Sequence, residues 1–132
     1  MRNDSSNPSD VVRSYLASFD NRDPDEIAAH VSDDFVNHHT SALATGSVGK
    51  AAYLDRLPEF LDSMPGLEYR IDELIASGAD VAVFYTMTGR WQDEHNFQLA
   101  GAQRFRVEDG LIVHRSDYWD SAVFQRQIEG ST

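Results

Sequence analysis

The chain has 132 residues, no cysteine, 41% hydrophobic residues and a formal net charge of −11 at pH 7. This length fits one domain with its own core, and a chain without cysteine has no disulfide framework and no thiolate chemistry. The charge argues against nucleic-acid binding, which needs clustered Lys and Arg, and no apolar run could span a membrane. Because residues 1–8 are too polar for a signal peptide, we expect a cytoplasmic protein with a disordered tail at 1–8 and a single domain at 9–132.

Three helices are predicted in the first half of the chain. Ser9 can cap the first helix, in which apolar residues recur at helical spacing: Val11, Val12, Tyr15, Leu16 and Phe19. Asp23-Pro24-Asp25-Glu26 is typical of a helix start, and we expect this short second helix to reach Val31 and end at Ser32-Asp33-Asp34. A third helix is indicated from Val48, with Pro58 kinking it or splitting its last turn.

The second half of the chain has the pattern of an antiparallel meander. A short strand at Phe35-Val36 precedes it and leads through Asn37-His38-His39 into a loop of small residues at 41–47. Strands are then predicted at 67–77, 81–91, 97–107 and 111–120, and a short helix at 121–128. The last two strands flank Glu108-Asp109-Gly110, a strong hairpin signal. Helices followed by a meander mean an α+β fold: a cone-shaped barrel of a curved, mixed but mainly antiparallel sheet packed on three helices, with a short C-terminal helix.

Alternation along the last strand gathers polar and aromatic groups on one face. Val113, Arg115, Asp117 and Trp119 share that face, and Ile112, His114, Ser116 and Tyr118 share the other. Asp117 could line a pocket, or it could simply pair with Arg115 or cap the last helix. Arg115 could bind an anionic ligand group or form an ion pair with Asp117 or Asp120.

Two adjacent histidines occur where the early strand ends. Because His38 and His39 point to opposite faces, at most one of them lines a given pocket. Adjacent histidines without a nearby acidic ligand are a weak metal signal, so we expect no metal. Either histidine could be a partly exposed polar residue, whereas one that faces a pocket would carry protons near neutral pH. Tyr15 likewise is either a core aromatic with its hydroxyl at the surface or a donor aimed into a cavity.

The order of local signatures resembles that of the nuclear-transport-factor-2-like superfamily, and its SnoaL-like branch of polyketide cyclases and ketosteroid-isomerase-like proteins is most similar. The resemblance covers about residues 9–128. The matching features include Val11-Val12-Arg13-Ser14-Tyr15-Leu16, Asp33-Asp34-Phe35-Val36, Met64-Pro65-Gly66-Leu67, Gly78-Ala79-Asp80-Val81, Asp109-Gly110-Leu111-Ile112 and Asp117-Tyr118-Trp119-Asp120. They imply the fold rather than the chemistry, since this fold hosts many activities.

The resemblance assigns site residues one by one. Tyr15 falls where ketosteroid isomerases keep their oxyanion-hole tyrosine, His39 where they keep their carboxylate base, and Gln103 where they keep a protonated aspartic acid. Asp117 matches a carboxylate of the water-activating site of limonene-epoxide hydrolase and is the best candidate for the acid/base aspartate of SnoaL-type cyclases. The Arg-x-Asp partners of the hydrolase site fall at Tyr85 and Met87, which argues against epoxide hydrolysis of that type.

Two functions follow from this set. The first is a cofactor-free enzyme of cyclase, isomerase or dehydratase type that binds a small, mostly apolar or aromatic molecule in the cone. His39 and Asp117 would move protons, and Tyr15 or Gln103 would stabilise an oxyanion. The expected lining of its site is Asn37, Tyr85, Met87, Gln103, Arg115 and Trp119. The second is a non-catalytic ligand-binding or dimerisation module, with a homodimer formed through the outer sheet face of Ile112, His114, Ser116 and Tyr118.

Overall fold

The computed structural model describes residues 7–39 and 46–129 and confirms the α+β architecture. Residues 1–6 of the tail expected at 1–8, and residues 41–45 of the small-residue loop expected at 41–47, lie outside the described residues, whereas Asn7 and Pro8 belong to the start of the first helix. In chain order the elements are α1 (Pro8–Ser18), η2 (Phe19–Asn21, a 3-10 turn), α2 (Pro24–Ala28), β1 (Val31–His39), β2 (Ser47–Val48), α3 (Lys50–Ser63), β3 (Glu68–Ser77), β4 (Asp80–Trp91), β5 (His95–Glu108), β6 (Leu111–Tyr118) and α4 (Ser121–Glu129).

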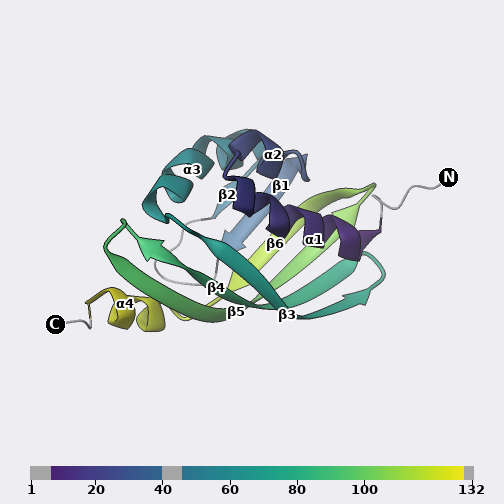
Figure 1. Cartoon of the computed structure of the whole chain (residues 1–132). Helices are drawn as coiled ribbons and strands as arrows, with labels where there is room; N and C mark the ends of the chain where they lie inside the picture. The colour runs from purple at the N-terminus through teal and green to yellow at the C-terminus, as the bar shows by residue number, and fades with distance from the viewer. Residues whose placement is uncertain (1–6, 40–45, 130–132) are drawn as a thin grey trace.

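The strands form one mixed, mainly antiparallel sheet of six strands in the order β2-β1-β6-β5-β4-β3. Every neighbouring pair is antiparallel except β1 and β6, which run parallel. Helices α1, α2 and α3 lie together over one face of the curved sheet, and α4 lies apart from them beside β5 (Figure 1). The concave face and the three helices therefore enclose the interior of the cone.

The core follows from alternation along the strands. In β4 and β5, the buried apolar positions are two residues apart, as a sheet with one covered face requires: Val81, Val83, Tyr85, Met87, Phe97, Leu99, Phe105 and Val107. The helices add apolar side chains at helical spacing: Val12, Tyr15, Leu16, Tyr53, Leu57 and Leu61. Both periodicities were visible in the sequence, which is why the layers could be predicted.

The first two helices begin at polar caps, and one cap was predicted wrongly. Asn7, not Ser9, caps α1, since the Asn7 side chain accepts a hydrogen bond of 2.9 Å from the Ser9 backbone N–H. Pro8 takes the first helical position, where its missing N–H costs nothing. Asp23 caps α2 as predicted, accepting from the Asp25 N–H at 3.0 Å.

Two boundaries differ from the prediction. Helix α2 stops at Ala28, and residues 31–34, expected to end this helix, already belong to β1. The reason is tertiary, because the parallel pairing of β1 with β6 starts at Val31 opposite Ile112, which outweighs the low strand preference of Asp33 and Asp34. Helix α3 also runs through Pro58 to Ser63 without a break; Leu57 and Leu61 are buried on either side of the proline and hold the helix against the sheet.

A β-bulge in β6 overturns the expected outer-face position of Ile112. Arg106 pairs with His114 while Val107 pairs with Ile112, so β6 carries one extra residue between these pairs. An extra residue shifts the alternation of side chains by one position. Ile112 therefore faces inward and is fully buried, whereas Tyr118, beyond the bulge, remains on the outer face with 46% exposure.

Candidate functional site

Strand register brings the predicted polar residues into neighbouring rows on the concave face. His39 of β1 lies opposite Asp117 of β6, and Asp117 lies opposite Gln103 of β5. Asn37 and Arg115 form the adjacent row. All five side chains point into the cone, which confirms the alternation that placed Asn37 and His39 on the same side and His38 on the other.

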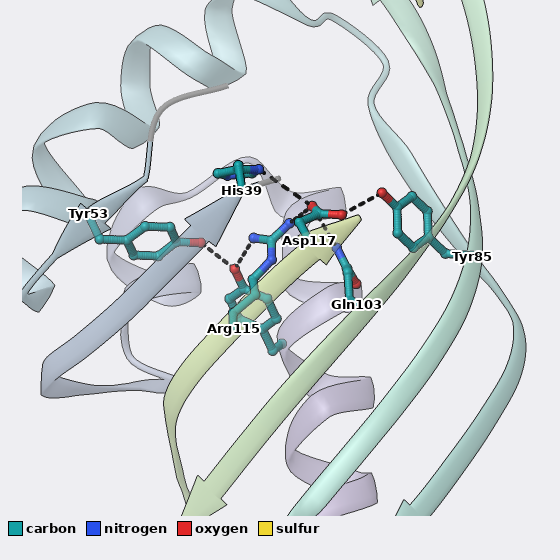
Figure 2. Close-up of polar contacts among 7 residues, drawn as sticks. His39, Tyr53, Tyr85, Gln103, Arg115 and Asp117 are labelled. Atoms are coloured by element: carbon teal, nitrogen blue, oxygen red, sulfur yellow. Dashed lines mark hydrogen bonds and ion pairs between the residues drawn. The ribbon is translucent and has the colours of Figure 1, made fainter. Parts of the chain in front are cut away.

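Asp117 is the centre of this cluster and is almost fully buried, at 3% exposure. Its Oδ1 accepts a hydrogen bond of 2.8 Å from the Tyr85 hydroxyl. Its Oδ2 accepts 2.8 Å from Arg115 Nη2 and 3.4 Å from Gln103 Nε2. Figure 2 shows these side chains converging from β4, β5 and β6. The carboxylate thus accepts from Tyr85, Gln103 and Arg115, and the Arg115 contact is also an ion pair, so the alternative of a pair with Arg115 is realised inside the cone.

Arg115 connects this carboxylate to two tyrosines on the helices. Its Nη1 donates 2.7 Å to the Tyr15 hydroxyl, which is also hydrogen-bonded to the Tyr53 hydroxyl of α3 (Figure 2). Burial lowers the pKa of Arg115, but Tyr15 and Asp117 outweigh that effect and raise it above its ordinary value, so the guanidinium stays charged. Burial, followed by neighbouring Tyr15, raises the pKa of Tyr53. The Tyr15 hydroxyl therefore lies in the interior rather than at the surface.

His39 forms the edge of the cluster. Its Nδ1 lies 4.0 Å from Asp117 Oδ2, and its side chain is 16% exposed against 4% for that of Asp117. Burial, reinforced by the charge of Arg115 and opposed by that of Asp117, lowers the pKa of His39 to about 4. The imidazole is consequently neutral at neutral pH, and its side chain is more exposed than that of Asp117.

Several polar atoms around Asp117 have no hydrogen-bond partner within the described residues. They are Asn37 Oδ1, His39 Nδ1, Gln103 Oε1 and Arg115 Nε, each inaccessible to solvent. A buried polar atom without a partner costs on the order of 1–3 kcal/mol. Atoms of this kind, gathered on one wall, are suited to a polar group of a bound molecule.

Aromatic and apolar side chains surround the polar cluster. Tyr85 and Met87 are buried, at 2% and 8% exposure, and Trp119 is half-buried against Phe124. Tyr69 lies edge-on to Tyr85, with ring centroids 5.5 Å apart. The predicted lining residues thus lie in the interior or at its rim, although Trp119 packs on α4 rather than on Asp117.

Two interior tyrosines, Tyr53 and Tyr69, were not predicted as part of this site. Tyr53 lies at a core position of α3. A signal was available, because a buried tyrosine needs a partner for its hydroxyl. For Tyr69, burial raises the pKa while the charge of Arg115 opposes the rise, which places the two groups near each other.

A separate groove of about 620 Å³ lies between β1, β2 and α3. Its lining residues are Val36, Asn37, His38, Gly46, Ser47, Val48, Ala52, Arg56 and His114. Asn37 belongs to both this groove and the polar cluster, but neither Asp117 nor His39 lines the groove. We therefore place the candidate site at the polar cluster, where the chemically active groups converge, and not in the groove.

The described part of the chain offers little for a metal ion. No group of three or more His, Asp and Glu side chains lies close enough together there to hold one. His39 and Asp117 would supply two ligands. Across the same described residues, no helix is long and apolar enough to cross a bilayer.

The fold and the cluster define a cone-shaped α+β domain with a polar interior, and the comparisons assign its family. The chain belongs to the SnoaL-like domain family, whose model matches residues 12–115. No curated protein matches the chain.

Solved structures share the fold at low sequence identity. A candidate polyketide cyclase from Xanthomonas campestris is 22% identical with a TM-score of 0.82, covering 92% of this chain and 96% of the other. An LEH-like epoxide hydrolase from M. tuberculosis is 24% identical with a TM-score of 0.76, covering 92% and 89%. TerC, crystallised with polyporic acid, is 21% identical with a TM-score of 0.81, covering 92% and 98%. At these identities the likeness concerns the fold.

Proposed function

We propose that this domain binds a small, mostly apolar molecule in the cone and transfers a proton to or from it through His39. The observation that carries the proposal is the position of His39 Nδ1, 4.0 Å from a carboxylate that three donors hold in place. A neutral imidazole beside a fixed carboxylate can accept a proton, because the carboxylate stabilises the imidazolium that forms. His39 would be the proton carrier and Asp117 its partner.

The protonation state of His39 sets what the rest of the site must supply. With a pKa of about 4, His39 is neutral and able to accept a proton at neutral pH, but it is a weak base. General-base catalysis is most effective when the pKa of the base lies near the operating pH. A proton on a carbon beside a carbonyl group is a much weaker acid than imidazolium, so its transfer to His39 requires that the site stabilise the negative charge formed on the carbonyl oxygen. Aldol-type cyclisation, isomerisation and dehydration all begin from such a proton.

The two linked tyrosines supply a donor for the developing negative charge. The Tyr15 oxygen accepts from Arg115, and the Tyr15 and Tyr53 hydroxyls share one hydrogen bond. Two hydroxyls have two protons, so one proton remains to donate to a substrate oxygen. A donor already oriented toward an oxyanion is worth a factor of about 10²–10³ in rate.

Hydrogen–deuterium exchange tests this proposal without knowledge of the natural substrate. The probe is 2-tetralone, an apolar aromatic ketone, and NMR follows exchange of its activated protons in D₂O. We expect exchange faster than in buffer, reduced about 10²-fold or more in His39→Ala. His38→Ala is the matched control, because the adjacent His38 lies on the outer side of β1. Equal exchange by wild type and His39→Ala would exclude proton transfer by His39.

One observation favours the alternative of a binding module without catalysis. Asp117 already accepts three hydrogen bonds from Tyr85, Gln103 and Arg115, as a structural carboxylate does. In that case wild-type protein would bind 2-tetralone, detected by NMR shift changes, and exchange no protons. If wild type binds 2-tetralone and exchanges its protons, and His39→Ala does not exchange them, the domain is an enzyme and not a binding module.

We also propose that the outer sheet face forms a homodimer. Phe84 and Tyr118 lie in the same row across the sheet, separated by Ala102, and are 43% and 46% exposed. Ile75, 52% exposed, lies close to this row. Sedimentation of Phe84→Glu should show monomers, whereas Leu111→Glu at the hairpin end should sediment as wild type. A wild-type monomer at micromolar concentration would refute the dimer.

A further inference from the structure

Tyr85 reaches Asp117 by lying across an intervening strand. Tyr85 of β4 is paired directly with Gly101 of β5, and β6 carries Asp117 on the far side of β5. The Tyr85 hydroxyl nevertheless donates 2.8 Å to Asp117 Oδ1. Figure 2 shows the Tyr85 side chain directed toward Asp117. The phenol ring therefore passes over Gly101.

Gly101 leaves the space that the ring occupies. A Cβ atom at position 101 would lie 2.5 Å from the Tyr85 hydroxyl oxygen and 2.6 Å from Tyr85 Cζ. It would also lie 3.0 Å from the Tyr118 carbonyl oxygen. Ordinary carbon contacts are about 3.5–4.0 Å, so the first two distances exclude any side chain while Tyr85 keeps its position.

Backbone conformation does not explain this glycine. The glycines with positive φ are Gly49, Gly66, Gly78 and Gly110, and Gly101 is not among them. A residue with a side chain could adopt the strand conformation at 101. Glycine inside a strand is unfavourable, and it often marks close approach of another group. The close group here is the Tyr85 ring.

We propose that Gly101 is a positioning residue of the site, which keeps the Tyr85 hydroxyl on Asp117 Oδ1 and so leaves Oδ2 to face His39 and Arg115. The expected effect on proton exchange rests on the proposed function, whereas the contact between Tyr85 and Asp117 does not. With Tyr85 in place, the two carboxylate oxygens have different partners. Without it, Arg115 and Gln103 both bind the other oxygen, Oδ2, so Oδ1 loses its hydrogen bond to Tyr85 and the orientation of the carboxylate is less restricted.

The test compares Gly101→Ala with Gly89→Ala. Position 89 is a matched control in the neighbouring strand, because a Cβ there would meet the Phe97 ring at 3.2 Å and Leu67 Cα at 3.3 Å, away from Asp117. Tyrosine labelled with ¹³C at Cζ reports the ionisation of each hydroxyl by NMR. In wild type, burial and the charge of Asp117 raise the pKa of Tyr85, so the Tyr85 signal should show no ionisation at any pH at which the protein stays folded.

In Gly101→Ala we expect the Tyr85 signal to titrate at clearly lower pH than in wild type, and 2-tetralone exchange to fall at least 10-fold. Both should be unchanged in Gly89→Ala. A Tyr85 titration unaffected by Gly101→Ala overturns the positioning role even if exchange falls. If the Tyr85 titration shifts in Gly101→Ala, the positioning role is supported, whatever the exchange result. If wild type exchanges no 2-tetralone protons, the proposed catalysis is refuted separately.

A double variant covers the case in which Gly101→Ala does not fold. Leucine at position 85 is too short to cross β5, so Tyr85→Leu should relieve the collision. If Tyr85→Leu/Gly101→Ala folds with the thermal midpoint of Tyr85→Leu, the steric account is supported. If Tyr85→Leu folds but Tyr85→Leu/Gly101→Ala fails to fold, as Gly101→Ala does, the account is wrong.

Discussion

Replacing Arg115 by methionine tests the buried ion pair on which the cluster depends. Methionine is close to arginine in length, so the change removes the charge and the donors with little loss of volume. Both side chains of the pair are almost fully buried, at 5% exposure for Arg115 and 4% for Asp117. The variant would leave Asp117 in the interior with Tyr85 and Gln103 but without a cation, and it would leave the Tyr15 hydroxyl without its donor.

The expected cost of Arg115→Met is large. Removing one partner of a buried ion pair costs about 3–5 kcal/mol. The double variant Arg115→Met/Asp117→Leu removes both charges, and replacing a whole buried pair by apolar residues is often neutral or stabilising. We therefore expect the double variant to be more stable than Arg115→Met by at least about 2 kcal/mol.

Urea unfolding measures both variants. With a slope of roughly 1.5 kcal/mol per molar urea for a domain of this size, Arg115→Met should lower the midpoint by about 2–3 M. Arg104→Met is the control, because Arg104 is 65% exposed and lies 3.6 Å from Asp80; exposed pairs contribute only about 0–1 kcal/mol. If Arg115→Met costs no more than Arg104→Met, the reasoning about the buried pair is refuted.

The remaining predictions concern acid stability and the C-terminal helix. The pKa of His39 is lowered from 6.5 to about 4 in the folded protein, so the unfolded chain binds more protons between these values. Stability should fall by roughly 3 kcal/mol as pH drops from 6.5 to 4. In urea unfolding, His39→Gln should lose that part of the pH dependence, and His95→Gln should retain it. If the unfolding free energy of His39→Gln changes with pH as steeply as that of wild type, the assignment to His39 is refuted. Phe124 contacts Trp91, Phe97 and Trp119 edge-on at centroid distances of 5.4–6.0 Å. Phe124→Ala should lower the free energy of unfolding by about 3–5 kcal/mol and alter tryptophan fluorescence. Replacement of the exposed Gln125 by alanine should do neither. If Phe124→Ala lowers the free energy of unfolding by less than about 1 kcal/mol, α4 is not anchored through Phe124.

Local chemistry made much of the fold predictable. Asp109 and Gly110 both have positive φ, at 53° and 78°, and join Glu108 directly to Leu111. This is the two-residue hairpin that Asp-Gly favours. Strand alternation placed Asn37, His39, Arg115 and Asp117 on one face, because that periodicity needs no knowledge of partner strands.

The parts that could not be predicted depend on pairing between distant segments. The bulge that turns Ile112 inward exists only relative to β5, and the start of β1 at Val31 is set by its pairing with Ile112 of β6. The Arg115–Tyr15 hydrogen bond joins residues 100 positions apart. Sequence patterns report which face a side chain occupies; they do not report which side chain it meets there.

The parallel pairing of β1 with β6 has a consequence for how the interior assembles. Val31 pairs with Ile112 and His39 with Asp117, so these contacts close loops of about 80 residues. Contacts that close large loops tend to form late and slowly, whereas the hairpins of β3, β4 and β5 are local. The imidazole and the carboxylate should therefore meet only when β1 and β6 come together, and a ribosome-bound chain that ends before β6 would hold most of the meander without the His39–Asp117 contact.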